Sequence, residues 1–194
     1  MLSPKYWQNR YEKSTTGWDI GHISPPIKAY VDQLTNKKLK ILIPGCGNAH
    51  EAAYLYAKGF EQVHLLDWAK APLQAFQKRH PEFPSKQLIV DDFFQHESSY
   101  DLIIEQTFFC AIEPKLRPKY VQQMHHLLKE EGHLAGLLFN ADFEGGPPFG
   151  GTKEEYTELF APYFEIKVME TADNSILPRA ERELFFLLKK GKLC

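Results

Sequence analysis

The sequence predicts an α/β fold built on an open, mostly parallel β-sheet. Short apolar runs alternate with helical patterns through five strand–helix steps, and a closing pair of strands follows. The chain has 194 residues, of which 43% are hydrophobic and 13% aromatic, and this is enough for one sizeable core. We therefore expect a single domain over residues 1–194.

The first strand is predicted over residues 40–44, because the sequence KILIP is short, apolar and bounded by proline and glycine. Residues 49–58 follow with good helix formers, and Gly59 stands where a helix C-cap would. Residues 62–66 supply the second predicted strand. This strand–helix–strand unit is the first step of the alternation.

The alternation continues toward the C-terminal end. The helix predicted over residues 116–128 has the clearest pattern, because Leu116, Tyr120, Met124 and Leu127 fall on one face. The other predicted elements are strands at 87–90, 100–105, 133–139, 164–170 and 183–188, and helices at 71–79 and 153–160. The sequence GGPPFGG at residues 145–151 is too rich in glycine and proline for regular structure.

Composition and charge limit the classes of partner that we expect for this chain. The net charge is −2 with both signs mixed along the chain, so a nucleic acid or an acidic membrane surface is not expected. No apolar run has the length of a signal peptide or of a transmembrane helix, which takes ~18 residues. Cys46, Cys110 and Cys194 are odd in number and widely spaced, which favours a reducing compartment. We expect a monomeric, cytoplasmic protein that acts on a small molecule.

The histidines do not predict a metal site. His125 and His126 are neighbours on a predicted helix, where adjacent side chains point about 100° apart and cannot easily chelate one ion. His22 and His50 lack the ligand spacing of a zinc or iron site. No metal is expected.

The loop after the first predicted strand is where a doubly wound sheet places its ligand. Gly45 and Gly47 let the backbone turn sharply and approach a ligand closely. Asp67 ends the second strand twenty positions after Gly47, where a carboxylate can accept hydrogen bonds from both hydroxyls of a ribose. His50 replaces the third glycine of the dinucleotide fingerprint. This spacing predicts a nucleoside-containing ligand.

Further acids and aromatic residues end the later strands. Asp91, Asp92 and Glu105 suit a ligand rich in amine and hydroxyl donors, although one of the aspartates is also a candidate helix N-cap. Aromatic rings near the same edge can form core or can stack on an adenine or face a sulfonium cation. These residues are Trp68, Phe93, Phe94, Phe108 and Phe109.

The glycine loop and its acid leave three classes of function open. The first is a methyltransferase that uses S-adenosylmethionine, and the second is a nicotinamide-dependent oxidoreductase. The second is disfavoured by His50 and by the lack of a second catalytic domain and of a Tyr-x-x-x-Lys pair. The third is a non-catalytic nucleoside-binding protein.

Longer motifs add a resemblance to a known family. PGCG at residues 44–47, DFF at 92–94, TFFCAIEPKLRPKY at 107–120 and GGPPF at 145–149 resemble the thiopurine S-methyltransferase family. TFFCAIEP followed by an RP pair looks most like its thiol and halide methyltransferase branch. The resemblance implies a Rossmann-like class I methyltransferase with a seven-stranded sheet in the order 3-2-1-4-5-7-6, strand 7 antiparallel, and helices on both faces.

The same resemblance implies S-adenosylmethionine as cofactor, S-adenosylhomocysteine as product, and a set of site residues. Residues 1–36 would cover the cofactor, and Asp67 would bind its ribose. The implied cofactor contacts, together with Gly47 of the glycine loop, are Trp7, Trp18, Gly45, Asp67, Trp68, Asp92, Phe93 and Glu105.

Methyl transfer from a sulfonium to a soft anion needs orientation more than a base or a covalent nucleophile. We expect Arg117, which matches a substrate-pocket arginine of the family, to draw an anionic acceptor inward, with Phe139 and Phe149 forming an apolar pocket. The alternative for Arg117 is a surface salt bridge. Thiols, thiopurines, sulfide, thiocyanate and halides all meet this requirement, so the sequence does not select among them.

Overall fold

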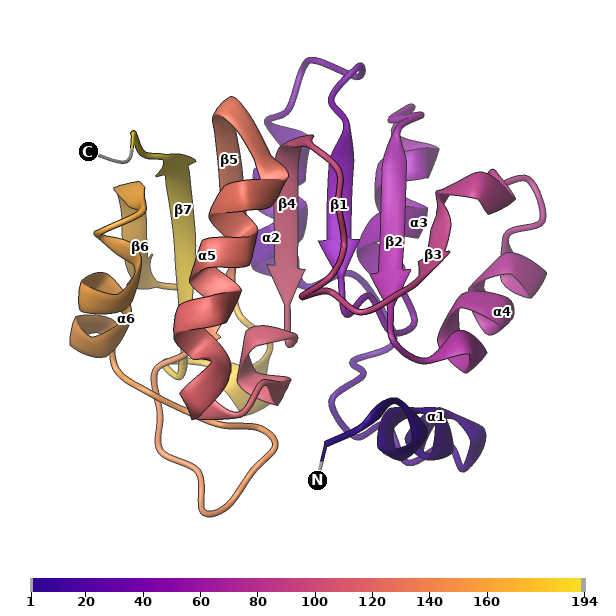
Figure 1. The fold of residues 1–194 in the computed structure, drawn as a ribbon. Helices are drawn as coiled ribbons and strands as arrows, with labels where there is room; N and C mark the ends of the chain where they lie inside the picture. Colours follow the sequence, from indigo (N-terminus) through magenta and orange to yellow (C-terminus); the bar gives the residue numbers. More distant parts are fainter. Residues whose placement is uncertain (1, 193–194) are drawn as a thin grey trace.

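The computed structural model describes residues 2–192, and Cys194 lies outside them. Seven strands form one sheet in the order β3-β2-β1-β4-β5-β7-β6 (Figure 1). The first five strands are parallel, and β7 is antiparallel to both neighbours, which confirms the predicted topology. The strands are β1 (Ile41–Pro44), β2 (Val63–Asp67), β3 (Leu88–Val90), β4 (Tyr100–Gln106), β5 (Leu128–Phe139), β6 (Phe164–Thr171) and β7 (Glu183–Lys190).

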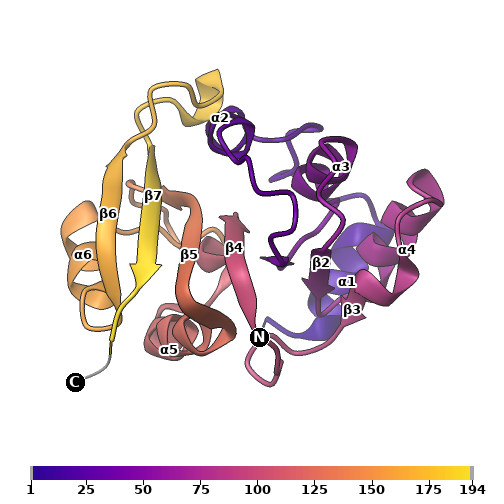
Figure 2. The same ribbon diagram turned by 90° about the horizontal axis from the view of Figure 1, so that it is seen from above.

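Helices cover both faces of the sheet, as expected (Figure 2). One buried apolar cluster joins α2 (Pro25–Asp32), α3 (His50–Ala57) and α4 (Lys70–Arg79) to the strands, and a second joins α5 (Arg117–Leu127) and α6 (Lys153–Phe160). The short 3₁₀ helices are Ser85–Gln87, Phe109–Ala111, Pro114–Leu116 and Leu177–Arg179. Within residues 2–192, no helix combines the length and the apolar character needed to cross a membrane.

β5 begins five residues before the predicted strand. Leu128 directly follows α5 and pairs with Tyr100, after which the register shifts so that His133 lies opposite Leu102. The intervening chain turns at Glu131, whose φ of 65° is left-handed. A bulge of this kind has no hydrophobic alternation, which is why the sequence pattern does not reveal it.

The N-terminal segment contains helices that the sequence analysis did not predict. α1 (Pro4–Glu12) lies beyond the carboxyl ends of β1 and β2 (Figure 1), and α2 covers the sheet. Both helices start at a Ser-Pro pair. Ser3 accepts a hydrogen bond from the Tyr6 N–H at 3.2 Å, and proline suits the first helical turn because its missing N–H is not needed there.

Candidate functional site

A cavity of about 510 Å³ lies at the carboxyl ends of β1 to β4, a size typical of small-molecule sites. It is bounded by these strand ends, by the N-terminal segment and by loops after β4, β5 and β6. The predicted site residues that line it are Trp7, Trp18, Gly45, Asp67, Trp68, Asp92, Phe93 and Phe139. Gly47, Glu105, Arg117 and Phe149 are not among its lining residues.

Two glycines shape the loop between β1 and α3. Gly45 and Gly47 have φ angles of 56° and 51°, a conformation that a Cβ disfavours. A Cβ on Gly45 would lie 2.2 Å from Cδ2 of Phe108, so no larger residue fits there without movement. Gly47 lines a neighbouring cavity of about 40 Å³ instead, and its N–H donates to Oδ2 of Asp67 at 3.1 Å. Gly45 therefore shapes the main cavity, and Gly47 supports its acid.

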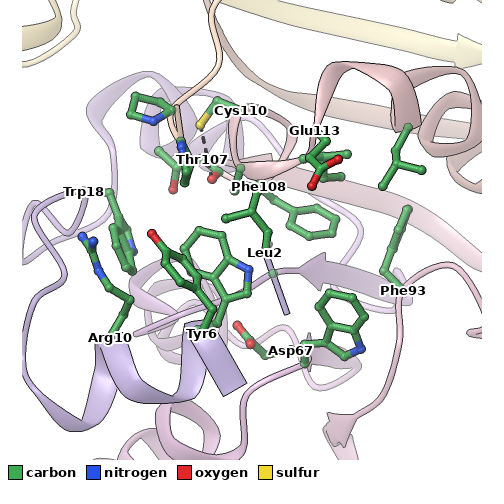
Figure 3. Close-up of a pocket in the computed structure, with 18 of the residues that line it drawn as sticks. Leu2, Tyr6, Arg10, Trp18, Asp67, Phe93, Thr107, Phe108, Cys110 and Glu113 are labelled. Atoms are coloured by element: carbon green, nitrogen blue, oxygen red, sulfur yellow. Dashed lines mark hydrogen bonds between the residues drawn. The ribbon is translucent and has the colours of Figure 1, made fainter. Parts of the chain in front are cut away.

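Asp67 ends β2 with its carboxylate at the edge of the cavity (Figure 3). The residue is 6% exposed, and the N–H groups of Gly47 and Ala69 donate to it at 3.1 and 2.8 Å. Burial raises the pKa of Asp67 to about 6, and these hydrogen bonds oppose the rise. Each carboxylate oxygen can still accept a further hydrogen bond from a ligand hydroxyl.

The loop after β3 contributes Asp92 and Phe93. Oδ1 of Asp92 accepts the N–H of Phe94 at 2.9 Å, so this aspartate caps a turn and not a helix. Phe93 is buried, and its ring meets that of Phe108 edge-on at 5.1 Å between centroids. Trp68 is 39% exposed. This side of the cavity offers apolar ring surface and a carboxylate, which together suit a flat heterocycle with amine donors.

Glu105 lies behind the cavity wall, whereas the sequence analysis expected a direct ligand contact. It is fully buried, and Oε1 accepts the N–H groups of Phe108 at 2.7 Å and Phe109 at 2.8 Å. Among residues 2–192, Oε2 has no hydrogen-bond partner. Burial raises the pKa of Glu105 to about 7, and the nearby Glu183 adds to the rise. Glu105 fixes the turn that brings Phe108 into the cavity.

Aromatic residues of the N-terminal segment close one side of the cavity. Trp7 and Trp18 meet edge to face with 5.6 Å between centroids, and Tyr11 meets Trp18 at 5.8 Å. The guanidinium of Arg10 lies 5.1 Å from the Trp18 ring, and both side chains stand at the edge of the cavity in Figure 3. Nη2 of Arg179 donates to the carbonyl of Trp18 at 2.7 Å. The segment is thus fastened to residues near β7.

The opposite end of the cavity is built by loops. Two apolar residues lie at the end of β5 and just after it, two belong to the glycine–proline loop, and two arginines precede β7. These lining residues are Phe139, Phe143, Pro147, Pro148, Arg179 and Arg182.

The two arginines differ in whether a carboxylate pairs with the guanidinium charge. Nη1 of Arg179 lies 3.2 Å from Oε1 of Glu183, which is 3% exposed, so this charge is paired. Arg182 is exposed, its guanidinium lies 5.1 Å from the Phe143 ring, and within residues 2–192 it has no ion pair or side-chain hydrogen bond. Arg182 is therefore available to an anion entering this end.

Arg117 and Phe149 take positions that the sequence analysis did not predict. Nη2 of Arg117 donates to the carbonyls of Phe149 and Gly150 at 3.2 and 2.8 Å, and the guanidinium lies 4.6 Å from the Phe109 ring. The N–H of Phe149 donates to the carbonyl of Cys110 at 2.7 Å. Within residues 2–192, Arg117 makes no surface salt bridge either. It holds the loop that carries Pro147 and Pro148, and Phe149 anchors that loop.

Sequence reasoning missed several lining residues. Tyr6, Arg10 and Tyr11 lie on α1, a helix without a strong apolar stripe, and Arg182 shows no motif. Thr107 carries a signal that only the backbone reveals, because its φ of 58° is strained for a β-branched residue. Within residues 2–192, no three or more His, Cys, Asp or Glu side chains are grouped to hold a metal ion.

Comparisons of sequence place the chain among methyltransferases. The family model described as Thiopurine S-methyltransferase (TPMT) matches residues 2–187. Probable thiol methyltransferase 2 of Arabidopsis thaliana is 32% identical over 193 residues, which cover 95% of this chain and 84% of that protein. Thiocyanate methyltransferase 1 of Brassica oleracea is 30% identical with the same coverages. Thiopurine S-methyltransferase of Vibrio atlanticus is 24% identical and covers 84% and 83%.

Solved structures share the fold at lower identity. The 1,6-didemethyltoxoflavin-N1-methyltransferase of Burkholderia thailandensis, with S-adenosylhomocysteine bound, superposes with a TM-score of 0.78 at 17% identity and covers 97% of this chain and 87% of that one. Magnesium protoporphyrin IX methyltransferase of Synechocystis with bound SAM gives a TM-score of 0.75 at 12% identity and covers 98% of both chains. These likenesses show the Rossmann-like class I fold.

Proposed function

The chain belongs to the thiopurine S-methyltransferase family and is an S-adenosylmethionine-dependent methyltransferase, and from this premise we propose that its acceptor is a small anionic sulfur nucleophile. Family membership sets aside the oxidoreductase and the non-catalytic alternatives. The observation that carries the proposal is the loop-built end of the cavity, where apolar walls meet the unpaired guanidinium of Arg182.

We call one part of the cavity the donor half. It consists of the strand ends of β1 to β3 and the aromatic residues of the N-terminal segment that face them. They fit S-adenosylmethionine, because Asp67 is a buried carboxylate with unused acceptor capacity beside a loop that tolerates no Cβ at Gly45. In the proposal Asp67 binds the ribose, Asp92 and Phe93 hold the adenine, and the aromatic residues Trp7, Trp18 and Trp68 enclose the cofactor. The bound cofactor supplies an electrophilic methyl group.

The acceptor half comprises Phe139, Phe143, Pro147, Pro148, Arg179 and Arg182. Its apolar walls exclude water from an incoming anion, and a poorly hydrated thiolate is a strong nucleophile. Arg182 lines this end with an exposed side chain, so its charge attracts an incoming anion through solvent. The walls then hold the nucleophile in line with the methyl carbon, an orientation effect worth several kcal/mol. No side chain needs to form a covalent intermediate.

Names of relatives support the same class of acceptor. They describe transfer to thiols, to thiocyanate and to thiopurines, and the chemistry these acceptors share is a polarisable sulfur nucleophile. The acceptor half, with two phenylalanines, two prolines and two arginines, offers apolar surface and positive charge. Glu113 also lines the cavity, but its carboxylate is paired with Nζ of Lys115 at 2.6 Å. Such a surface favours a small anion over a neutral amine.

The test is mass spectrometry of methylated products after incubation with isotopically labelled S-adenosylmethionine and a mixture of thiols, hydrosulfide, thiocyanate and iodide. Volatile products are collected from the headspace. We expect labelled thioethers, methanethiol and methyl thiocyanate, and far less of each from Asp67→Ala enzyme at limiting S-adenosylmethionine. Methylation of iodide alone, or methylation confined to nitrogen and oxygen acceptors added to the same mixture, would refute the sulfur assignment.

A further inference from the structure

The carboxylate of Asp19 joins the N-terminal segment to the glycine loop. Asp19 lies between α1 and α2, and its Oδ1 accepts the N–H of Gly21 at 2.8 Å and Nε2 of His50 at 2.7 Å. Its Oδ2 accepts Nδ2 of Asn48. The side chains of Asp19 and His50 are 20% and 30% exposed. We call the contacts among Asp19, Asn48 and His50 the Asp19 clasp.

The backbone of the glycine loop orients the side chains of Asn48 and His50 toward Asp19. Ala49 stands between Asn48 and His50 in the left-handed conformation, with φ 56° and ψ 41°, so α3 starts at an abrupt turn. The carbonyl of Asn48 accepts Nη2 of Arg79 at 2.8 Å, which fixes the loop from its other side. The clasp therefore explains why this loop has Asn48 and His50 where smaller residues would leave a freer backbone.

Asp19 is ionised in this setting. Partial burial opposes the charge, but the hydrogen bonds from Gly21, Asn48 and His50 outweigh it and hold the pKa of Asp19 below its usual value. Hydrogen bonds to a charged acceptor are stronger than those between neutral groups. The clasp is thus stronger than ordinary loop contacts, such as the single bond that His22 makes to the carbonyl of Ile23 at 2.7 Å.

The residue before Asp19 is Trp18, which lines both the main cavity and the small one beside the glycine loop. Trp18 packs against Trp7 and Tyr11, so its position determines that of the aromatic group over the donor half. Ser24 adds a second tie between the same segments, because its buried N–H donates to Glu51 at 3.3 Å. Fixing Asp19 therefore fixes Trp18 and the aromatic residues packed against it, which we call the cover of the donor half.

We propose that Asp19, Asn48 and His50 are positioning residues that keep Trp18 closed over bound cofactor and so set its rate of release. This inference rests on the proposed placement of the cofactor in the donor half. In this role the glycine loop does two things at once. Gly45 shapes the wall of the main cavity and Gly47 supports Asp67, while the side chains of Asn48 and His50 fasten the segment above the ligand. Opening the clasp loosens Trp18, which still keeps the bond from Arg179 to its carbonyl, without altering the groups beneath the ligand.

The experiment measures binding and release of S-adenosylhomocysteine, not turnover. All three tryptophans, Trp7, Trp18 and Trp68, line the cavity, so intrinsic fluorescence reports binding. In stopped-flow mixing, the observed rate extrapolated to zero ligand gives the release rate. We expect Asp19→Asn to release the ligand about tenfold faster, the effect of weakening hydrogen bonds to one charged group. His50→Ala should accelerate release several-fold, while His50→Gln, which keeps a donor, should stay near the wild-type rate.

Two further variants complete the design. The double variant Asp19→Asn/His50→Ala should accelerate release by less than the product of the two single effects, because both changes act on the same interaction. His22→Gln, at an exposed histidine of the same segment, should leave release unchanged. Tryptic cleavage after Lys13 should be faster in Asp19→Asn and His50→Ala than in the control, even with ligand bound.

The outcomes separate the two proposals. If the wild-type protein binds S-adenosylhomocysteine and the clasp variants release it at the wild-type rate, the clasp is overturned and the proposed function stands. If calorimetry detects no binding to wild-type protein, the proposed function fails. If Asp19→Asn does not fold, the contrast between His50→Ala and His50→Gln decides the question alone.

Discussion

The donor and acceptor halves of the cavity are built by different means. In the donor half, Gly45 and Asp67 stand at strand ends, and backbone N–H groups orient the carboxylate directly. In the acceptor half, Pro147 and Pro148 belong to a loop that depends on Arg117 for its position. Strands with fixed register suit a ligand that never changes, whereas loops can vary without disturbing the sheet. The difference suggests one cofactor site coupled to an adaptable acceptor site.

The largest effect is expected from removing the donor-half acid. Asp67→Ala deletes the acceptor of two ligand hydroxyls, and two hydrogen bonds to a charged group are worth about 3 kcal/mol, or roughly a hundredfold in Kd. Titration of tryptophan fluorescence with S-adenosylhomocysteine measures this. Asp101→Ala, which removes a carboxylate that pairs with Lys129 outside the cavity, is the matched control. An equal loss in both variants would contradict the ribose assignment.

Asp67 also predicts a pH dependence of binding. Its pKa in the free protein is raised to about 6, and hydroxyl donors favour the ionised form. Binding must therefore release a proton below this pH, and affinity should fall as the pH drops from 7 to 5. Calorimetric titration at several pH values should show this slope in the wild-type protein and its absence in Asp67→Ala.

Glu105, which lies behind the cavity wall and fixes the turn that carries Phe108, predicts an effect on stability. Its folded pKa is raised from 4.5 to about 7, so the folded protein binds more protons than the unfolded chain between these values, and stability falls as pH rises through them. Glu105→Gln removes this titration while keeping an oxygen for Phe108 and Phe109. Relative to wild type, the variant should gain about 2 kcal/mol between pH 5 and 8. Urea unfolding measures the gain, and a pH-independent difference would refute it.

The fold was predictable because its signals are local and repeated. Each buried strand is a short apolar run bounded by turn residues, and α6 begins with a complete capping box between Thr152 and Glu155. The exceptions are α1 and α2 in the N-terminal segment, and the bulge in β5, which depends on pairing with β4. The bulge has no periodicity that could be read along the chain. Both helices, in contrast, begin with a Ser-Pro start signal, and α2 places Ile27 and Val31 one turn apart on its buried face, so readable signals of both helices were overlooked.

The glycine loop and the acid of the donor half were predictable for the same reason, whereas most of the acceptor half was not. Asp67 follows Gly47 at a spacing fixed by one strand–helix–strand unit, so sequence distance translates into spatial distance. Arg179, by contrast, reaches the carbonyl of Trp18 across 161 positions, and only the folded chain shows it. Arg117 illustrates the limit, because the residue type suits an anion, but its Nη2 donates to two loop carbonyls and the side chain does not line the cavity.

Arg117 therefore offers a sharper test of the two halves. Arg117→Met keeps much of the apolar stem but loses the bonds to the carbonyls of Phe149 and Gly150. We expect the acceptor KM to rise about tenfold, the value of charge-assisted hydrogen bonds worth about 1.5 kcal/mol, with the Kd of S-adenosylhomocysteine unchanged. Arg117→Lys should recover part of the loss. A loss that appears only with acceptors carrying a second negative charge would instead favour direct contact between Arg117 and the acceptor.

The smallest effect is expected at Arg182, where charge acts without a fixed partner. Replacing it in Arg182→Gln keeps a polar side chain at the rim but removes the attraction for an anionic acceptor, so kcat/KM should fall about threefold at low salt, as for other exposed charges. Because ions screen exposed charges, the wild-type value should decline with added salt toward that of the variant. Lys38→Gln, an exposed cation near the amino end of β1, is the control and should change neither value. Steady-state rates with thiocyanate from 10 to about 300 mM salt measure kcat/KM and its salt dependence in each protein. A salt response that persists in Arg182→Gln would show that another residue attracts the anion.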